Sequence, residues 1–127
     1  MRGKRAVYTT GILRRSPKTK FALVDCVNLG AIPRKITVQV IDWSNGNPVP
    51  LKVIPCNLTK CTVTVGANKS KFLYADVSKV VFKYEVRITQ ADVANFVTNV
   101  YGVTNSPFKP QTGEAVLQRD LVKLTKI

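Results

Sequence analysis

Histidine is absent from this chain of 127 residues, and acidic residues are scarce. The missing histidine removes the side chain that most often acts as a general acid or base near neutral pH. It also leaves the three cysteines one ligand short of a structural zinc site. The seven acidic residues form no close pair in the sequence: Asp25, Asp42, Asp76, Glu85, Asp92, Glu114 and Asp120. We therefore predict that the protein is not an enzyme, with no catalytic residue, no cofactor and no metal site.

Long apolar runs are also missing. No stretch approaches the roughly 20 apolar residues that a membrane-spanning helix needs. The basic N-terminus is not followed by the apolar segment of a secretory signal. We expect no membrane span and, for a protein outside the cell, export without a cleaved signal peptide.

What the chain does have is apolar content and positive charge. Apolar residues make up 45% of its 14.0 kDa, which is enough for the core of one domain. The net charge is +13, and such a surplus favours contact with anionic surfaces such as nucleic acid, acidic glycans or acidic proteins. The alternative is that the charge only keeps the protein soluble. Nucleic acid is the less favoured partner, because basic residues are spread along the strands instead of alternating with aromatic rings.

The basic residues are densest at the N-terminus. Residues 1–20 carry seven Lys and Arg and no acid, and five of them are candidate contacts for anionic partners: Arg2, Lys4, Arg5, Arg14 and Arg15. Between these charges, residues 6–13 (AVYTTGIL) are typical of a β-strand. We divide the chain into a basic N-terminal arm (1–18) and a sandwich domain (19–127). The apolar residues of the arm are predicted to dock on a neighbouring subunit: Val7, Tyr8, Ile12 and Leu13.

The rest of the chain alternates apolar and polar residues with period two, which indicates half-buried strands. The clearest run is 80–89, in which every second side chain is apolar. Further strands are predicted at 21–27, 36–41, 51–54, 61–65, 71–76, 96–103 and 115–125. Turn residues such as Asn45-Gly46 separate them. The fold class is all-β, an antiparallel β-sandwich or jelly roll of about eight strands with a strand-like N-terminal arm.

Three local features refine this prediction. Pro48, Pro50 and Pro55 crowd one strand, which should lie at a sheet edge or be broken by bulges because proline donates no ladder hydrogen bond. Trp43 is expected in the core, with a contact surface as the alternative. Residues 90–95 are the one stretch that favours a helical turn, with Asp92 as its cap.

The cysteines are Cys26, Cys56 and Cys61. The four residues between Cys56 and Cys61 allow a hairpin that closes a disulfide, which leaves Cys26 as the odd cysteine. The alternative is that all three are reduced thiols packed as small apolar groups.

Several of these segments together resemble a group of small proteins from endospore-forming bacteria, part of which belongs to the spore surface. They are residues 36–46 (ITVQVIDWSNG), 48–51 (PVPL), 84–88 (YEVRI), 97–102 (VTNVYG) and 116–124 (VLQRDLVKL). In architecture the chain is similar to the jelly-roll fibre subunits of endospore appendages, and the resemblance covers about residues 21–127. Those subunits polymerise through an N-terminal connector that carries cysteines, whereas residues 1–20 contain none.

The predicted sandwich, its basic arm and the resemblance are compatible with three functions. The first is a self-assembling structural subunit of an extracellular or spore-surface fibre or coat, linked by donation of the N-terminal arm to a neighbouring subunit. The second is a capsid-like protein whose basic arm faces nucleic acid. The third is a binding module for anionic glycan or coat protein. A strand-like arm favours the first, since an arm that neutralises nucleic acid should be low in β-propensity.

Overall fold

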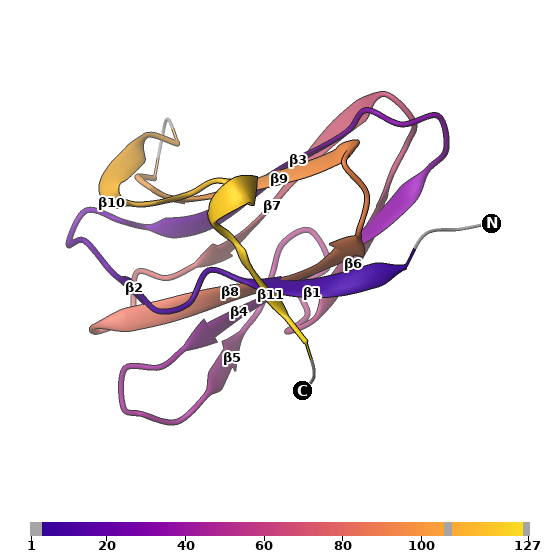
Figure 1. Cartoon of the computed structure of the whole chain (residues 1–127). Coiled ribbons are helices and arrows are strands. Elements are labelled where there is room, and N and C mark those ends of the chain that lie inside the picture. Colours follow the sequence, from indigo (N-terminus) through magenta and orange to yellow (C-terminus); the bar gives the residue numbers. More distant parts are fainter. Residues whose placement is uncertain (1–3, 106–107, 126–127) are drawn as a thin grey trace.

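The computed structural model describes residues 4–105 and 108–125, which form an antiparallel β-sandwich (Figure 1). These residues contain eleven strands and one short 3₁₀ turn: β1 (Arg5–Thr9), β2 (Leu13–Arg14), β3 (Phe21–Asn28), β4 (Arg34–Asp42), β5 (Val49–Leu51), β6 (Cys61–Val65), β7 (Lys69–Asp76), β8 (Lys83–Ala91), β9 (Phe96–Val103), β10 (Pro110–Val116), η1 (Gln118–Asp120) and β11 (Val122–Leu124).

The strands pair into two sheets. The seven-stranded sheet has the order β11-β1-β8-β4-β5, with β2 beside β8 and β6 beside β4. The four-stranded sheet has the order β10-β9-β3-β7. All the described pairings are antiparallel. The predicted all-β sandwich is confirmed.

Two segments that the sequence predicts as single strands are each divided in the structure. Residues 6–13 form β1 and β2, separated by a break at Gly11, whose φ of +69° suits glycine. Residues 115–125 form the end of β10, then η1, then β11. Because β10 and β11 belong to different sheets, η1 carries the chain from one layer to the other. These divisions are one reason why the described residues form eleven strands and not the predicted eight.

The core lies between the sheets and is built by period-two alternation. Along β8, Tyr84, Val86 and Ile88 are fully buried, as the pattern predicts. The alternation does not extend to Phe82, which precedes β8 and is 55% exposed. β4 and β3 contribute the matching inward side chains, among them Ile36, Val38, Val40, Ala22 and Val24.

The proline-rich segment lies at an edge, as predicted. Within the described residues β5 pairs with β4 alone and ends the order of the seven-stranded sheet. Pro50 is exposed there, so its missing N–H costs no ladder hydrogen bond inside the sheet.

Two local predictions are wrong. Residues 90–95 form no helical turn, because β8 continues to Ala91 and a turn then leads into β9. Trp43 is half-buried and lies outside the core, because its indole N–H donates to Glu85 on the outward side of the sheet.

The N-terminal segment belongs to the seven-stranded sheet of its own chain. β1 is an inner strand between β8 and β11, and β2 pairs with β8 (Figure 1). In the single chain, residues 5–14 are therefore part of the sandwich. The structure shows no separate arm within these residues, although the predicted division placed them in an arm that ends at residue 18. Docking of this segment on a neighbouring subunit stays a prediction.

Candidate assembly site

β1 is paired along its whole length with β8, and its residues Val7–Thr9 are also paired with β11. Its register places Val7 opposite Thr89 of β8 and opposite Leu124 of β11. If β1 left its place, β8 and β11 would each present a row of unpaired N–H and C=O groups. A strand close to the N-terminus thus completes the sheet.

The four apolar residues predicted for the assembly arm have different surroundings. Leu13 is buried in the core and only 8% exposed, whereas Ile12 is 51% exposed. Tyr8 is half-buried and packs against the core, and Val7 is half-buried on the outward side of the sheet. The structure therefore brings Tyr8 and Leu13 into the chain's own core and leaves Ile12 accessible.

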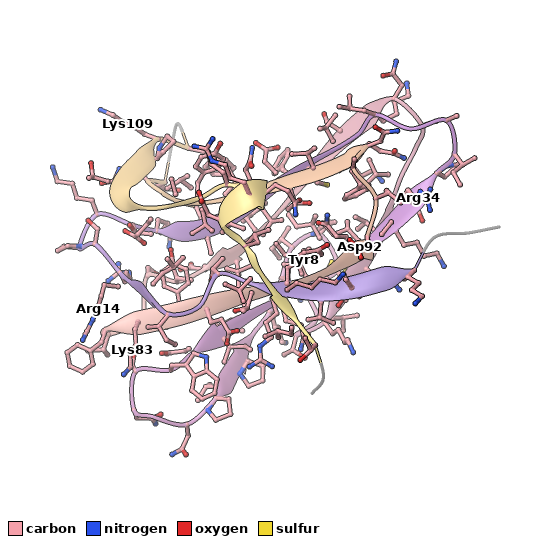
Figure 2. All side chains as sticks on the ribbon, in the orientation of Figure 1. Tyr8, Arg14, Arg34, Lys83, Asp92 and Lys109 are labelled. Carbon is pink, nitrogen blue, oxygen red and sulfur yellow. A yellow bond between two sulfur atoms is a disulfide. The ribbon has the colours of Figure 1, made fainter. Side chains whose placement is uncertain are left out.

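Tyr8 also ties β1 to the loop after β8. Its hydroxyl donates to Asp92 at 3.0 Å, and the two side chains point toward one another in Figure 2. Lys123 of β11 donates to the same carboxylate at 2.5 Å. The hydrogen bonds from Lys123 and Tyr8 hold the pKa of Asp92 below its ordinary value, and burial together with Asp92 raises the pKa of Tyr8. One exposed carboxylate thus links three elements around β1.

Of the basic residues predicted to contact anionic partners, Arg5 and Arg15 donate to neutral groups of their own chain. Arg5 donates to the Thr37 hydroxyl at 3.2 Å, and Arg15 donates to the Thr19 carbonyl at 3.0 Å. Arg14 lies opposite Lys83 across β2 and β8, so two like charges sit side by side at one end of β8 (Figure 2). The backbone carbonyl of Lys4 accepts from the Asp92 N–H. Arg2 lies outside the described residues.

A buried carboxylate fixes the link between β2 and β3. Glu114 of β10 is 1% exposed and accepts hydrogen bonds from the Ser16 N–H at 2.9 Å and the Thr19 hydroxyl at 2.6 Å. Its other oxygen accepts from the Tyr84 hydroxyl at 2.7 Å. Burial and the contact with Glu114 raise the pKa of Tyr84 far above its ordinary value. The link that carries the chain from one sheet to the other is thus attached to the core.

A second buried carboxylate lies on the outward side of the seven-stranded sheet. Glu85 is 6% exposed and accepts from the Trp43 indole at 2.8 Å, from Arg87 at 2.8 Å and from the Thr9 hydroxyl. Burial opposes its ionisation, but the hydrogen bonds from Arg87, Thr9 and Trp43 outweigh burial and lower its pKa. The C-terminal end of β1 is thereby attached to β8.

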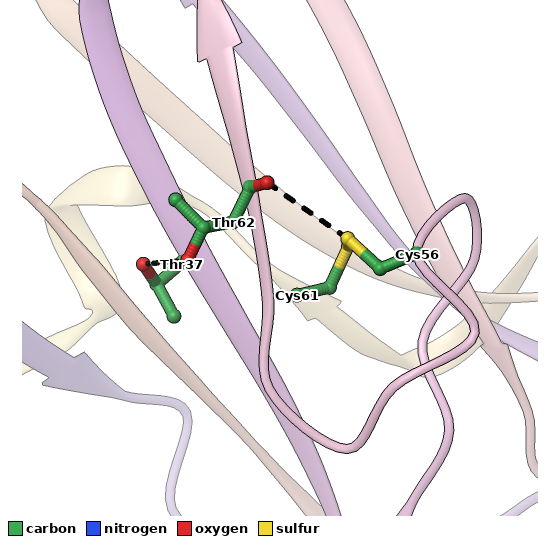
Figure 3. Close-up of a disulfide and its surroundings, with 4 residues drawn as sticks. All are labelled: Thr37, Cys56, Cys61 and Thr62. Atoms are coloured by element: carbon green, nitrogen blue, oxygen red, sulfur yellow. Dashed lines mark hydrogen bonds between the residues drawn. A yellow bond between two sulfur atoms is a disulfide. The ribbon is translucent and has the colours of Figure 1, made fainter.

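The disulfide that the four-residue spacing of Cys56 and Cys61 allows is present in the structure. Cys56 and Cys61 form a disulfide with their Cα atoms 5.4 Å apart, beside Thr62 and Thr37 (Figure 3). Cys26 is a free, buried thiol on the inward side of β3. Burial raises the pKa of Cys26 to about 11, so the thiol is protonated and unreactive at neutral pH. The position of Cys26 does not favour a bridge between subunits.

A cluster of aromatic rings that the sequence does not predict lies on the outside of the four-stranded sheet. Phe21 packs edge-on against Tyr74 and Phe108, with ring centroids 5.2 and 5.5 Å apart. Phe72 stacks beside Tyr74 at 6.1 Å and is 53% exposed. Alternation along 71–76 places Phe72 and Tyr74 on one side of their strand, but only long-range pairing brings in Phe21 and Phe108. We call Phe21, Phe72, Tyr74 and Phe108 the aromatic cluster.

Among the described residues, no helix is long and apolar enough to cross a membrane. No protein-family model and no curated protein matches the chain.

Three solved structures are similar to it at low identity. Thermotoga maritima 1070 has a TM-score of 0.48 at 13% identity and covers 99% of this chain and 97% of its own. The Anabaena sensory rhodopsin transducer has a TM-score of 0.46 at 12% identity, with coverage of 83% and 93%. The E. coli chaperone DraB has a TM-score of 0.33 at 13% identity, with coverage of 98% and 54%. These likenesses are too distant to indicate a function.

Proposed function

We propose that this protein is a structural subunit that assembles with copies of itself on an extracellular or spore surface. The copies are joined by exchange of residues 4–14, which we call the exchange segment. The supporting observation is that β1, close to the N-terminus, is an inner strand paired with both β8 and β11. The same segment of a second copy can make the same hydrogen bonds, so exchange of identical elements costs little free energy.

The link after the exchange segment has the length that exchange requires. Residues 15–20 join β2 to β3 and so pass from one sheet to the other. Six extended residues span about 20 Å, whereas packed sheets lie about 10 Å apart. An extended link therefore carries the exchange segment beyond its own sandwich. Donation from each copy to the next is a heterologous contact, which builds an open filament unless the rotation closes a ring.

Nucleic acid is the alternative partner. The paired state of β1 and β2 is unlike the unpaired basic arms that neutralise phosphates, and this favours assembly over nucleic acid. Binding to duplex DNA that falls steeply with salt, with a log–log slope of about −0.9 per phosphate contacted, would favour the alternative.

A cross-linking experiment tests the exchange. Val7 and Thr89 are directly opposite in the register of β1 and β8, so Val7→Cys and Thr89→Cys together should form a disulfide. Cys26→Ala in the same protein removes the free thiol. Oxidation at the concentration where electron microscopy shows filaments should give a ladder of covalent oligomers on non-reducing denaturing gels.

Its matched control uses a pair that exchange does not separate. Thr37 and Thr62 are opposite one another across β4 and β6, so Thr37→Cys with Thr62→Cys should remain a monomer on the same gel. Cross-linked Val7→Cys/Thr89→Cys protein that runs only as a monomer would refute the exchange.

A further inference from the structure

The outward side of the four-stranded sheet is rich in aromatic and aliphatic side chains along β3, β7 and β9. Ala22, Val24 and Cys26 of β3, Leu73 and Ala75 of β7, and Phe96 and Val100 of β9 lie in the core, so the positions between them point outward. Lys69 and Lys71 share the parity of Leu73 but are exposed at the start of β7. The outward positions are Phe21, Leu23, Asp25, Val27, Ser70, Phe72, Tyr74, Asp76, Val97, Asn99, Tyr101 and Val103. Two are acids and none is Lys or Arg. We call this surface, with Phe108, the aromatic face.

The charged side chains at these twelve positions are both acidic, although the chain as a whole has a net charge of +13. Asp76 is paired with Lys20 at 2.9 Å, and Lys20 also lies 5.5 Å from the Phe21 ring centroid. Asp25 is exposed beside Phe72 in the register of β3 and β7 and takes part in none of the salt bridges between described residues. With Asp76 neutralised by Lys20, Asp25 is the acid of this face that is left to attract a basic partner.

The opposite outer surface of the sandwich has the complementary charge. By the same alternation, the outward positions of β1, β8 and β4 include four bases and one acid: Arg5, Lys35, Lys83, Arg87 and Glu85. The acid is already neutralised, because Glu85 accepts from Arg87. We call this surface the basic face.

We propose that the aromatic face of one copy binds the basic face of the next copy. Exposed aromatic rings supply the apolar contact at the centre, and Asp25 faces the surplus of Lys and Arg across it. The two surfaces lie on opposite sides of the sandwich, so the contact is heterologous and repeats from copy to copy. The proposal rests on the self-assembly proposed above but does not require exchange of β1.

The first test removes the apolar contact. Phe72→Ser should lower self-association of the full chain at least tenfold, measured by sedimentation velocity over a concentration series. Phe82→Ser is the matched control, because Phe82 is 55% exposed against 53% for Phe72 but lies outside the aromatic face. Equal self-association of the two variants and the unmodified chain would overturn the proposal.

The second test identifies the two faces. Asp25→Lys and Lys35→Asp should each weaken self-association, because the first makes the aromatic face basic and the second lowers the positive charge of the basic face. Mixing the two proteins should restore it, because the altered aromatic face of one then meets the altered basic face of the other. If an aromatic face instead binds a second aromatic face, Lys35→Asp alone should leave self-association unchanged. That result, or the absence of rescue, would overturn the heterologous contact.

These outcomes are separable from those of strand exchange. Loss of self-association in Phe72→Ser with monomeric cross-links in Val7→Cys/Thr89→Cys supports stacking of faces without exchange. Covalent ladders that persist in Phe72→Ser, together with unchanged association, support exchange without stacking.

Discussion

The two buried carboxylates, Glu85 and Glu114, make an informative comparison. Each accepts hydrogen bonds from three protein groups, and they are 6% and 1% exposed. Glu85 lies on the outward side of its sheet and has a cationic donor, Arg87. The protein donors described for Glu114 are neutral, and it lies between the sheets.

Despite these different environments, both carboxylates hold the N-terminal part of the chain. Glu85 binds the Thr9 hydroxyl at the end of β1, and Glu114 binds Ser16 and Thr19 in the link that follows. The exchange segment is therefore attached at one point on the surface and at one point in the core. The surface attachment is charge-assisted and should respond to pH, whereas the core attachment depends on satisfying buried donors.

Removing the core attachment should have the largest effect. Glu114→Ala leaves the donors of Ser16, Thr19 and Tyr84 without their acceptor, at about 1–3 kcal/mol for each buried group. We expect a loss of about 3–5 kcal/mol in the free energy of unfolding, measured by urea denaturation, and faster formation of covalent oligomers in the Val7→Cys/Thr89→Cys protein. Stability within 1 kcal/mol of the unmodified chain would show that the link is held by other contacts.

Filling the space beside Glu114 should have a slightly smaller effect. A Cβ atom at Gly102 would lie 2.7 Å from the carboxyl carbon of Glu114 and 2.8 Å from its Cβ. Gly102→Ala should therefore displace the carboxylate and cost about 2–4 kcal/mol in unfolding free energy. In the Glu114→Ala background the clash with the carboxyl group is gone and only the contact with the Cβ of residue 114 remains, so the same substitution should cost less. Equal costs in both backgrounds would contradict a clash with the carboxyl group.

Removing the surface attachment should cost less than either. Glu85→Ala deprives Trp43, Arg87 and Thr9 of their acceptor. Trp43 and Arg87 are half-buried, so water can replace the carboxylate there, whereas Thr9 is 8% exposed and loses a buried partner. The expected loss is about 1–3 kcal/mol. Trp43 is the single tryptophan of the chain, so its fluorescence reports on this site directly. An unshifted emission spectrum in Glu85→Ala would contradict the contact.

The smallest expected effect is the pH dependence of the surface attachment. Because the pKa of Glu85 is lowered from 4.5 in the native state, its stabilisation is fully present above pH 4.5 and is lost as the pH falls through the lowered value. Asp76, whose pKa is lowered to about 2, loses its contribution to stability over a pH range that overlaps with that of Glu85. The difference between the unmodified chain and Glu85→Gln isolates Glu85, and it should shrink below pH 4.5.

The alternating sequence predicted most of the fold because local periodicity reports which side of a strand is buried. β9 spans Phe96–Val103, as predicted, and the edge position of β5 follows from its prolines. Periodicity does not report which sheet a strand joins. The pattern of 115–125 therefore continues across η1, although the chain changes layers there.

The features of the candidate site depend on contacts that are distant in sequence. Trp43 was expected in the core from its apolar area, but the acceptor for its indole N–H, Glu85, lies on the outward side. Phe21 and Phe108 meet Tyr74 only through pairing of β3 with β7 and the course of the loop before β10. Glu114 is an isolated acid in the sequence, and nothing nearby indicates that Ser16 and Tyr84 surround it.

The adjacency of β1 and β11 has a consequence for how the molecule is made. On the ribosome, β1 emerges before any of the other described strands, but β8 follows only after more than half of the chain, and β11 comes last. Such non-local pairing folds slowly, because a long loop must close before its contacts form. Throughout this interval β1 has no partner within its own chain.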